Sequence, residues 1–222
     1  MKNILIVYYS RMGHTARMVR TIADELEALG NTVTVMPVSE ALREGVDWSK
    51  HDFVLCGFPV VYGTYHPNVY EFVRNNCTEL DRKPNAMFNV TVVARTPFKA
   101  TVEGNRYMQK FLERSPWRPR DLKCFAGKID YPHLNLFDKK CIQLIMKITN
   151  GPTDPSMCID FTDWEDVKQT PNTSPSLPTK LNLRLILNVF ISRNPLKLAG
   201  YAFFRTETND RYSRISMDQA LP

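Results

Sequence analysis

The chain has 222 residues, of which 43% are hydrophobic, so it is long enough to bury the core of one full domain with a large insertion or tail. Its formal charge of +6 indicates an anionic partner, such as nucleic acid, an anionic membrane surface or a carboxylate-bearing substrate. No zinc finger, RNA-binding signature or basic arm is visible, so we expect no nucleic-acid partner. No uncharged apolar run reaches the roughly 20 residues of a membrane span.

The cysteines are scattered and odd in number, and none forms a C-x-x-C pair. This arrangement disfavours a disulfide framework and a zinc site, so we expect no metal and reduced, buried thiols. The first strand begins almost at the N-terminus, which leaves no room for a signal or transit peptide. The five cysteines are Cys56, Cys77, Cys124, Cys141 and Cys158.

A buried strand is predicted from Ile4 to Tyr8, and an amphipathic helix from Thr15 to Leu29, with Gly30 as its C-cap. The polar turn between them has hydroxyls and a glycine at Ser10, Gly13 and Thr15. Backbone N–H groups and the helix dipole at such a turn hold a phosphate, and glycine lets the backbone come close. The alternative is an ordinary capped helix start.

The spacing of this turn disfavours two other phosphate sites. A nucleoside triphosphate loop needs a longer glycine-rich stretch that ends in Lys-Ser/Thr, and a dinucleotide fingerprint needs three glycines. Neither is present. The strand followed by S-x-x-G-x-T instead resembles the FMN phosphate loop of flavodoxin-like proteins, which holds a monophosphate without metal or lysine.

Two more strands are predicted at Thr32 to Met36 and Phe53 to Gly57. The resulting succession of strand, helix, strand, connection and strand is typical of a parallel α/β sheet. An aromatic loop, residues 58–67, leads from the second of these two strands into a helix from about Asn68 to Asn76. In a parallel sheet this loop faces the phosphate loop, because both follow strand ends. Tyr62 or Tyr65 would then cover a flavin ring; the alternative is a solvent-exposed turn with incidental tyrosines.

The next elements are a strand from Ala86 to Ala94, which places Arg95 at the same edge, and a helix from Thr101 to Arg114. A fifth strand begins at Cys124 to Ile129, and its continuation is predicted only at Met157 to Phe161. A long insertion, about residues 130–157, therefore splits the last strand.

The insertion has a basic amphipathic helix from Phe137 to Ile148. Such a helix lies on an anionic membrane, lines a pocket for an apolar ligand, or packs on its own domain, and the pattern leaves these open. Its predicted apolar residues are Phe137, Cys141, Leu144, Ile145 and Ile148, and its lysines are Lys139, Lys140 and Lys147.

Residues 168–222 differ in composition from the rest of the chain. A Pro/Ser connector at residues 171–178 has no helical period, and an apolar stretch follows at residues 181–191. We therefore expect one domain over residues 1–167 and a linker with an atypical tail over residues 168–222.

Residues 1–167 resemble the menaquinone-dependent protoporphyrinogen IX dehydrogenase family. The long insertion in the last strand also separates that family from electron-carrier flavodoxins, whereas the tail after residue 167 departs from its pattern. The motifs that carry the resemblance are Tyr62-Gly63-Thr64-Tyr65-His66, Val93-Ala94-Arg95, Ser115-Pro116-Trp117-Arg118-Pro119, Ala126-Gly127, Tyr131-Pro132, Leu144-Ile145-Met146-Lys147 and Thr162-Asp163-Trp164.

The resemblance implies a flavodoxin-like, doubly wound fold with a five-stranded parallel sheet in the order 2-1-3-4-5. It also implies FMN as cofactor, protoporphyrinogen IX as substrate and a membrane quinone, menaquinone or ubiquinone, as electron acceptor. Peripheral association with the cytoplasmic side of a membrane follows as an expectation, with a mitochondrial membrane surface as the alternative. A homo-oligomer is compatible with the resemblance.

The site residues follow from the two loops and from the end of the fourth strand. His66 and Arg95 are the candidate catalytic residues, as a proton acceptor and as a ligand of a substrate carboxylate or flavin carbonyl. For the cofactor we predict contacts from Ser10, Arg11, Met12, Gly13, His14, Thr15, Pro59, Val60, Tyr62, Gly63, Thr64, Tyr65, Ala94 and Arg95.

Three other functions share these features. An NAD(P)H:quinone reductase would reduce its flavin with a nicotinamide donor, and a flavodoxin-type electron carrier would be shorter and acidic. A membrane-surface binding module would keep the fold and the flavin without turnover. The basic charge and the insertion favour the quinone-dependent dehydrogenase.

Overall fold

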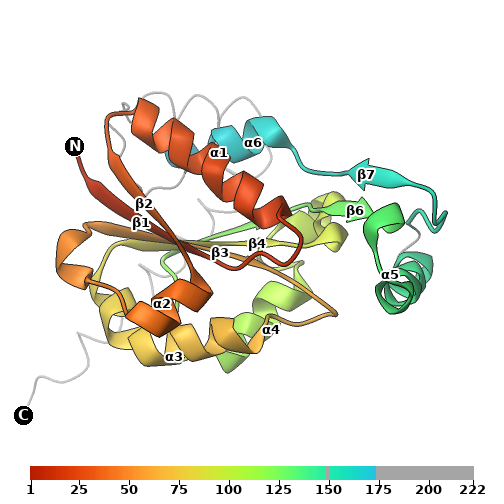
Figure 1. The fold of residues 1–222 in the computed structure, drawn as a ribbon, viewed down its shortest axis with the longest axis horizontal. Helices are drawn as coiled ribbons and strands as arrows, with labels where there is room; N and C mark the ends of the chain where they lie inside the picture. The colour runs from red at the N-terminus through yellow and green to blue at the C-terminus, as the bar shows by residue number, and fades with distance from the viewer. Residues whose placement is uncertain (149–150, 174–222) are drawn as a thin grey trace, which may run out of the picture. The chain divides into compact units, whose positions relative to one another are not determined.

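The computed structural model describes residues 1–148 and 151–173. Its centre is a sheet of five parallel strands (Figure 1). The strands lie in the order β2-β1-β3-β4-β5. The chain adds β2 on one side of β1 and the later strands on the other side, so the strand order switches at β1. The predicted fold class is confirmed. The strands are β1 (Asn3–Tyr8), β2 (Thr32–Pro37), β3 (Phe53–Pro59), β4 (Asn85–Val90) and β5 (Asp121–Phe125).

Helices cover both faces of this sheet (Figure 1). Alternating side chains of β1 point to opposite faces of the sheet. Ile4 and Ile6 pack against α1 on one face, whereas Leu5 and Val7 pack on the other face, which α2, α3 and α4 cover. The first layer holds α1 (His14–Ala28), α6 (Trp164–Lys168) and α7 (Thr170–Thr173), and the second holds α2 (Val38–Glu44), α3 (Pro67–Arg82) and α4 (Arg106–Arg114).

The fourth strand is shorter than predicted. It ends at Val90, and residues Val92–Arg95 form a 3₁₀ helix closed by a hydrogen bond from Ala94 N to Thr91 O of 3.1 Å. This turn takes Ala94 and Arg95 out of the sheet.

The helix that follows, α4, begins later than predicted, at Arg106, because Asn105 caps it by accepting a hydrogen bond from Met108 N. In contrast, α3 continues beyond Asn76 to Arg82.

The two pieces predicted as one split strand lie in different sheets. β5 is complete within the parallel sheet, whereas β6 (Lys128–Asp130) pairs antiparallel with β7 (Cys158–Asp160). The break falls at Ala126 and Gly127, where the Ala126 carbonyl accepts a hydrogen bond from Thr162 Oγ1 at 3.0 Å. The insertion therefore leaves the sheet as a separate two-stranded ribbon.

The ribbon carries the helix α5 (Leu136–Ile148), which begins one residue before the predicted start at Phe137 and ends where predicted (Figure 1). The buried face of α5 differs from the predicted one: Asp138 and Met146 are buried, and Ile142 and Ile145 pack against their cluster. Most of the predicted apolar face is exposed, because α5 docks through its other side. Phe137 is 70% exposed, Leu144 60% and Ile148 73%.

The predicted apolar stretch at residues 181–191 lies outside the described residues.

Candidate cofactor site

The loop between β1 and α1 has the features of an anion-binding turn. Gly13, the N-cap of α1, has a φ of 82°, a left-handed conformation that favours glycine. Gly13 has no side chain to cap the helix, so the first-turn amides other than Ala16 N can serve a ligand. Ser10 Oγ accepts a hydrogen bond from Ala16 N at 3.3 Å, and Thr15 is buried beside it. This set of donors fits a phosphate monoester.

The aromatic loop after β3 ends in a tight turn. Val61 and Thr64 exchange backbone hydrogen bonds of 2.8 and 3.1 Å around Tyr62 and Gly63, which both have positive φ. Two central residues with positive φ are typical of a type I′ turn, and the conformation is strained for a tyrosine. The strain is held by the surrounding turn, and the Tyr62 ring remains 47% exposed at the edge of the site.

The two loops open into one cavity at the carboxyl ends of β1, β3 and β4. Its walls are mainly apolar. The strand ends and the two loops form one part of the wall, and side chains of α5 form another part. A flat aromatic ring with a phosphate tail fits this combination. The lining residues are Ser10, Arg11, Met12, His14, Thr15, Pro59, Val60, Val61, Tyr62, Gly63, Val90, Thr91, Val92, Val93, Tyr107, Gly127, Lys128, Leu134, Asp138, Ile142, Ile145 and Met146.

Two contacts hold α5 to the two loops, and a third joins the loops to each other. Arg11 Nη2 lies 3.0 Å from Asp138 Oδ2, and the Arg11 guanidinium lies 4.8 Å from the centre of the Tyr62 ring. Tyr62 in turn meets Phe137 edge to face, with 6.1 Å between ring centres. The phosphate loop, the aromatic loop and the insertion are thus joined above the cavity.

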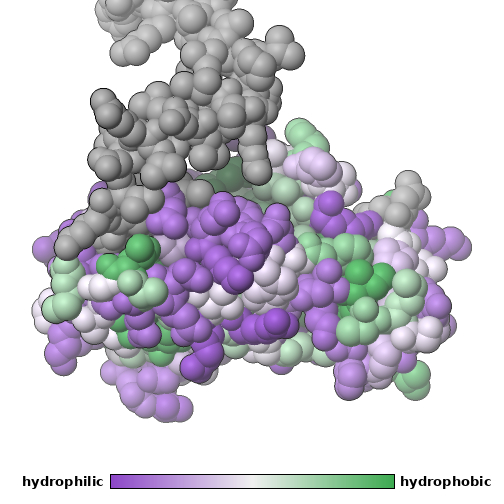
Figure 2. Space-filling view, turned by 90° about the horizontal axis from the view of Figure 1, so that it is seen from above, coloured by the Kyte–Doolittle hydropathy of each residue, from purple (hydrophilic) through white to green (hydrophobic). Residues whose placement is uncertain are grey.

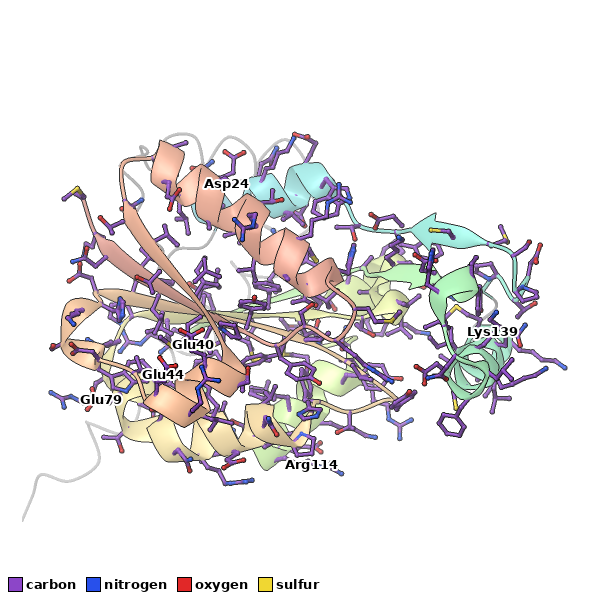
Figure 3. All side chains as sticks on the ribbon, viewed as in Figure 1. Asp24, Glu40, Glu44, Glu79, Arg114 and Lys139 are labelled. Carbon is purple, nitrogen blue, oxygen red and sulfur yellow. The ribbon has the colours of Figure 1, made fainter. Side chains whose placement is uncertain are left out.

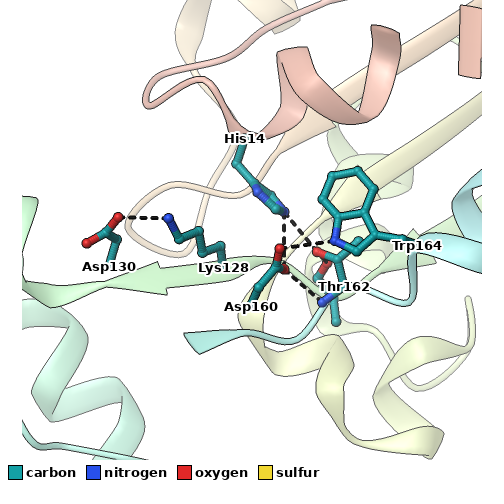
Figure 4. A network of polar contacts seen from close by, with 7 residues as sticks. His14, Lys128, Asp130, Asp160, Thr162 and Trp164 are labelled. Atoms are coloured by element: carbon teal, nitrogen blue, oxygen red, sulfur yellow. Dashed lines mark hydrogen bonds and ion pairs between the residues drawn. The ribbon is translucent and has the colours of Figure 1, made fainter. Parts of the chain in front are cut away.

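His14 belongs to a second network, which ties the start of α1 to the chain after β7 (Figure 4). Its Nε2 lies 2.8 Å from Thr162 Oγ1 and 3.9 Å from Asp160 Oδ1, and Asp160 Oδ2 accepts a hydrogen bond from Trp164 Nε1 at 3.1 Å. Burial lowers the pKa of His14 against the opposing attraction of Asp160, which favours the neutral form of the imidazole. The network therefore fixes the start of α1 against the chain at and after β7.

The structure brings nine of the predicted cofactor residues to the cavity wall and leaves five away from it. Tyr65 differs from its predicted place over a ring: it is buried in the core, where its OH accepts a hydrogen bond from Asn89 Nδ2 at 3.0 Å. The Thr64 backbone closes the turn, and Gly13 shapes the loop behind the wall. Ala94 and Arg95 leave the sheet in the 3₁₀ helix described above, and neither lines the cavity.

The two candidate catalytic residues also lie outside the cavity wall. His66 caps α3, since its Nδ1 accepts a hydrogen bond from Asn68 N at 3.2 Å, and its ring stacks on Tyr9. Arg95 donates a hydrogen bond to Val92 O at 3.2 Å, with its guanidinium 5.9 Å from the centre of the Phe161 ring. Both have structural partners, and neither reaches the cavity in this conformation.

Sequence reasoning missed the cavity residues from β4, α4 and the insertion. Val90 to Val93 lie in the last part of the strand predicted from Ala86 to Ala94, near the edge already identified, so this position could have indicated them. Lys128 and Asp138 carry no such signal, because they reach the cavity only through the fold of the ribbon and α5.

Comparison with known proteins agrees with this geometry. A family model described as a flavodoxin domain matches residues 5–156. A protein of Escherichia coli (strain K12) named protoporphyrinogen IX dehydrogenase (quinone) is 38% identical over 163 residues, which cover 73% of this chain and 89% of that protein. A protein of Leishmania major with the same name is 34% identical over 176 residues, or 78% of this chain and 75% of that protein. The chain belongs to the flavodoxin-domain family that includes these quinone-type protoporphyrinogen IX dehydrogenases.

Proposed function

We propose that this protein binds FMN and oxidises protoporphyrinogen IX to protoporphyrin IX, with a quinone as electron acceptor. The observation that carries the proposal is the cavity in which the loop between β1 and α1 meets an apolar wall from the insertion. The names of the relatives support the substrate and the acceptor, and the monophosphate-type loop supports FMN among the flavins.

The residues of the cavity have separable tasks. The first-turn amides of α1, with Ser10 and Thr15, hold the phosphate, while Pro59, Val60 and Tyr62 border the space for the ring. When bound, FMN supplies the hydride acceptor for each two-electron dehydrogenation. The side chains of α5 exclude water from the reacting side, which favours the apolar macrocycle over small polar donors.

The Thr15→Ala variant tests the phosphate loop. We expect it to weaken FMN binding by about 1.5–3 kcal/mol, the value of a hydrogen bond to a charged group, because it removes a buried hydroxyl beside the phosphate. Titration of the flavin-free protein with FMN, followed by fluorescence quenching, measures this. Thr21→Ala is the matched control, since its hydroxyl donates to Arg17 O outside the loop. Equal FMN affinity in both variants would contradict the assignment.

Anaerobic turnover tests the reaction itself. The FMN-loaded protein with protoporphyrinogen IX and a soluble quinone analogue should produce porphyrin fluorescence above a protein-free control, with three quinones consumed per porphyrin. An NAD(P)H:quinone reductase would instead oxidise reduced nicotinamide and leave the porphyrinogen unchanged. An electron carrier would do neither without a partner reductase.

We further propose that α5 rests on an anionic membrane surface, from which the quinone is reached. Leu136, Phe137, Leu144 and Ile148 are each at least 60% exposed and share the helix with three lysines. Hydrophobic residues gather on the right of Figure 2, the end that carries the insertion. Lys139 lies on α5, whereas Asp24, Glu40, Glu44 and Glu79 lie on α1, α2 and α3 (Figure 3). No helix among the described residues could span a bilayer.

The Leu144→Glu/Ile148→Glu double variant tests this surface. We expect its partitioning to vesicles of phosphatidylcholine and phosphatidylserine to fall about 100-fold in sedimentation, because two apolar side chains are lost from the interface. Leu29→Glu, which changes an exposed apolar residue at the end of α1, is the control. Equal partitioning of the two variants would refute the proposal.

A further inference from the structure

Asp138 is a buried carboxylate on the wall of the cavity. It is 5% exposed, and its Oδ2 accepts hydrogen bonds from Arg11 Nη2 at 3.0 Å and Asn135 Nδ2 at 3.3 Å. Its backbone N–H is also bonded, to Asn135 Oδ1 at 2.8 Å. The carboxylate is therefore held in one orientation by partners on two different elements.

The other carboxylate oxygen, Oδ1, is buried and has no hydrogen-bond donor within the described part of the chain. A buried acceptor without a donor is destabilising, and such atoms occur where a ligand or a reaction supplies the missing proton. Because Asp138 lines the cavity, a donor on a molecule bound there is the one that fits.

Asp138 is also the sole carboxylate among the described residues that line the cavity. His14, the lining imidazole, is already bonded to Thr162, and Lys128 is paired with Asp130 at 2.8 Å. Arg11 cannot accept a proton. The other walls are apolar or carry hydroxyls, so among the described lining residues Asp138 Oδ1 is the buried acceptor that lacks a hydrogen-bond donor.

We propose that Asp138 accepts the proton that leaves a pyrrole nitrogen of the porphyrinogen in each dehydrogenation, an inference that rests on the function proposed above. One C–H bond of a bridging methylene breaks, and its electron pair leaves with the hydrogen as hydride, for which bound FMN would be the acceptor. One pyrrole N–H bond breaks, its electron pair forms a C=N bond, and the proton moves to Asp138 Oδ1. The proton then returns to solvent, and the quinone finally receives both electrons. Three such steps remove three methylene and three N–H hydrogens; the remaining methylene then passes one proton to a nitrogen, which leaves the four CH bridges and two N–H groups of the porphyrin.

The Asp138→Asn variant is the test, because it keeps the shape and an oxygen for Arg11 but cannot accept the proton. We expect flavin reduction by protoporphyrinogen IX in an anaerobic rapid-mixing experiment to slow about 100- to 10,000-fold. FMN affinity and the rate of reoxidation by a quinone analogue should remain those of the unaltered protein. Asp154→Asn is the control for loss of a carboxylate in the same insertion, since the Asp154 carboxylate accepts its hydrogen bonds from Ser156 N and Oγ, and Asp154 does not line the cavity.

Chemical rescue separates proton transfer from a structural role. Formate should restore flavin reduction to Asp138→Ala in a concentration-dependent way, because it supplies a carboxylate to the vacated space. Unchanged flavin reduction in Asp138→Asn, or a loss of FMN affinity that accounts for the slower rate, would overturn the proposal. If the unaltered FMN-loaded protein is not reduced by the porphyrinogen at all, the proposed function fails instead.

Discussion

The Trp117→Ala variant is expected to lose about 3–5 kcal/mol of its free energy of unfolding. Trp117 is fully buried beneath α4 and meets Phe111 edge to face, with 6.4 Å between ring centres. Its backbone is fixed by Ser115 Oγ, which accepts from Trp117 N at 3.1 Å and donates to Trp117 O at 3.0 Å. The backbone cannot collapse into the space that the indole leaves, so a large cavity remains.

Trp117→Phe is the matched control for this cavity. The indole Nε1 is buried without an acceptor in the described part of the chain, so phenylalanine loses ring volume but no hydrogen bond. We expect the loss to be clearly smaller than for alanine. Urea unfolding followed by circular dichroism measures both variants. Equal losses would indicate that packing around Trp117 does not govern its contribution.

The Gly57→Val variant is expected to lose about 3 kcal/mol, because β3 and β4 leave no room for a side chain at this position. Gly57 pairs directly with Phe88, and a Cβ atom on Gly57 would lie 2.4 Å from Phe88 Cζ and 2.9 Å from Phe88 Cε1. The Phe88 ring cannot move freely, because it is fully packed and meets Phe125 edge to face at 5.4 Å.

A double-mutant cycle identifies the cause. Phe88→Leu shortens the opposing side chain, so the Gly57→Val/Phe88→Leu variant should lose less than the sum of the two single losses. The same urea unfolding measures all three variants. Additive losses would show that the valine is destabilising for a reason other than its clash with Phe88.

The sheet and the turn between β1 and α1 could be predicted from the sequence, because their signals are local. The apolar run of β1, the helical period of α1 and the turn at Gly13 lie within 30 residues, and each is decided by neighbours in the chain. The end of β4 could not be predicted in this way. Val92 to Ala94 continue the strand pattern, and the 3₁₀ turn is visible only from the backbone bond to Thr91.

The role of α5 at the cavity needed the fold. Its sequence has two overlapping apolar stripes, and docking buries the one that contains Ile142 and Met146. Asp138 then becomes buried because Arg11, 127 residues away in the chain, supplies its opposite charge. On a helix with several lysines, a single aspartate is most often solvated, so periodicity could not mark it as part of the site.

The central claim is that one cavity carries electrons from a porphyrinogen to a quinone through a bound flavin. Anaerobic mixing of the FMN-loaded protein with protoporphyrinogen IX, followed by addition of a menaquinone or ubiquinone analogue, tests it most directly. The account predicts that the long-wavelength flavin absorbance bleaches on the first addition and recovers on the second, while porphyrin fluorescence grows above a protein-free control. A flavin that stays oxidised in the presence of porphyrinogen but bleaches with reduced nicotinamide would contradict it.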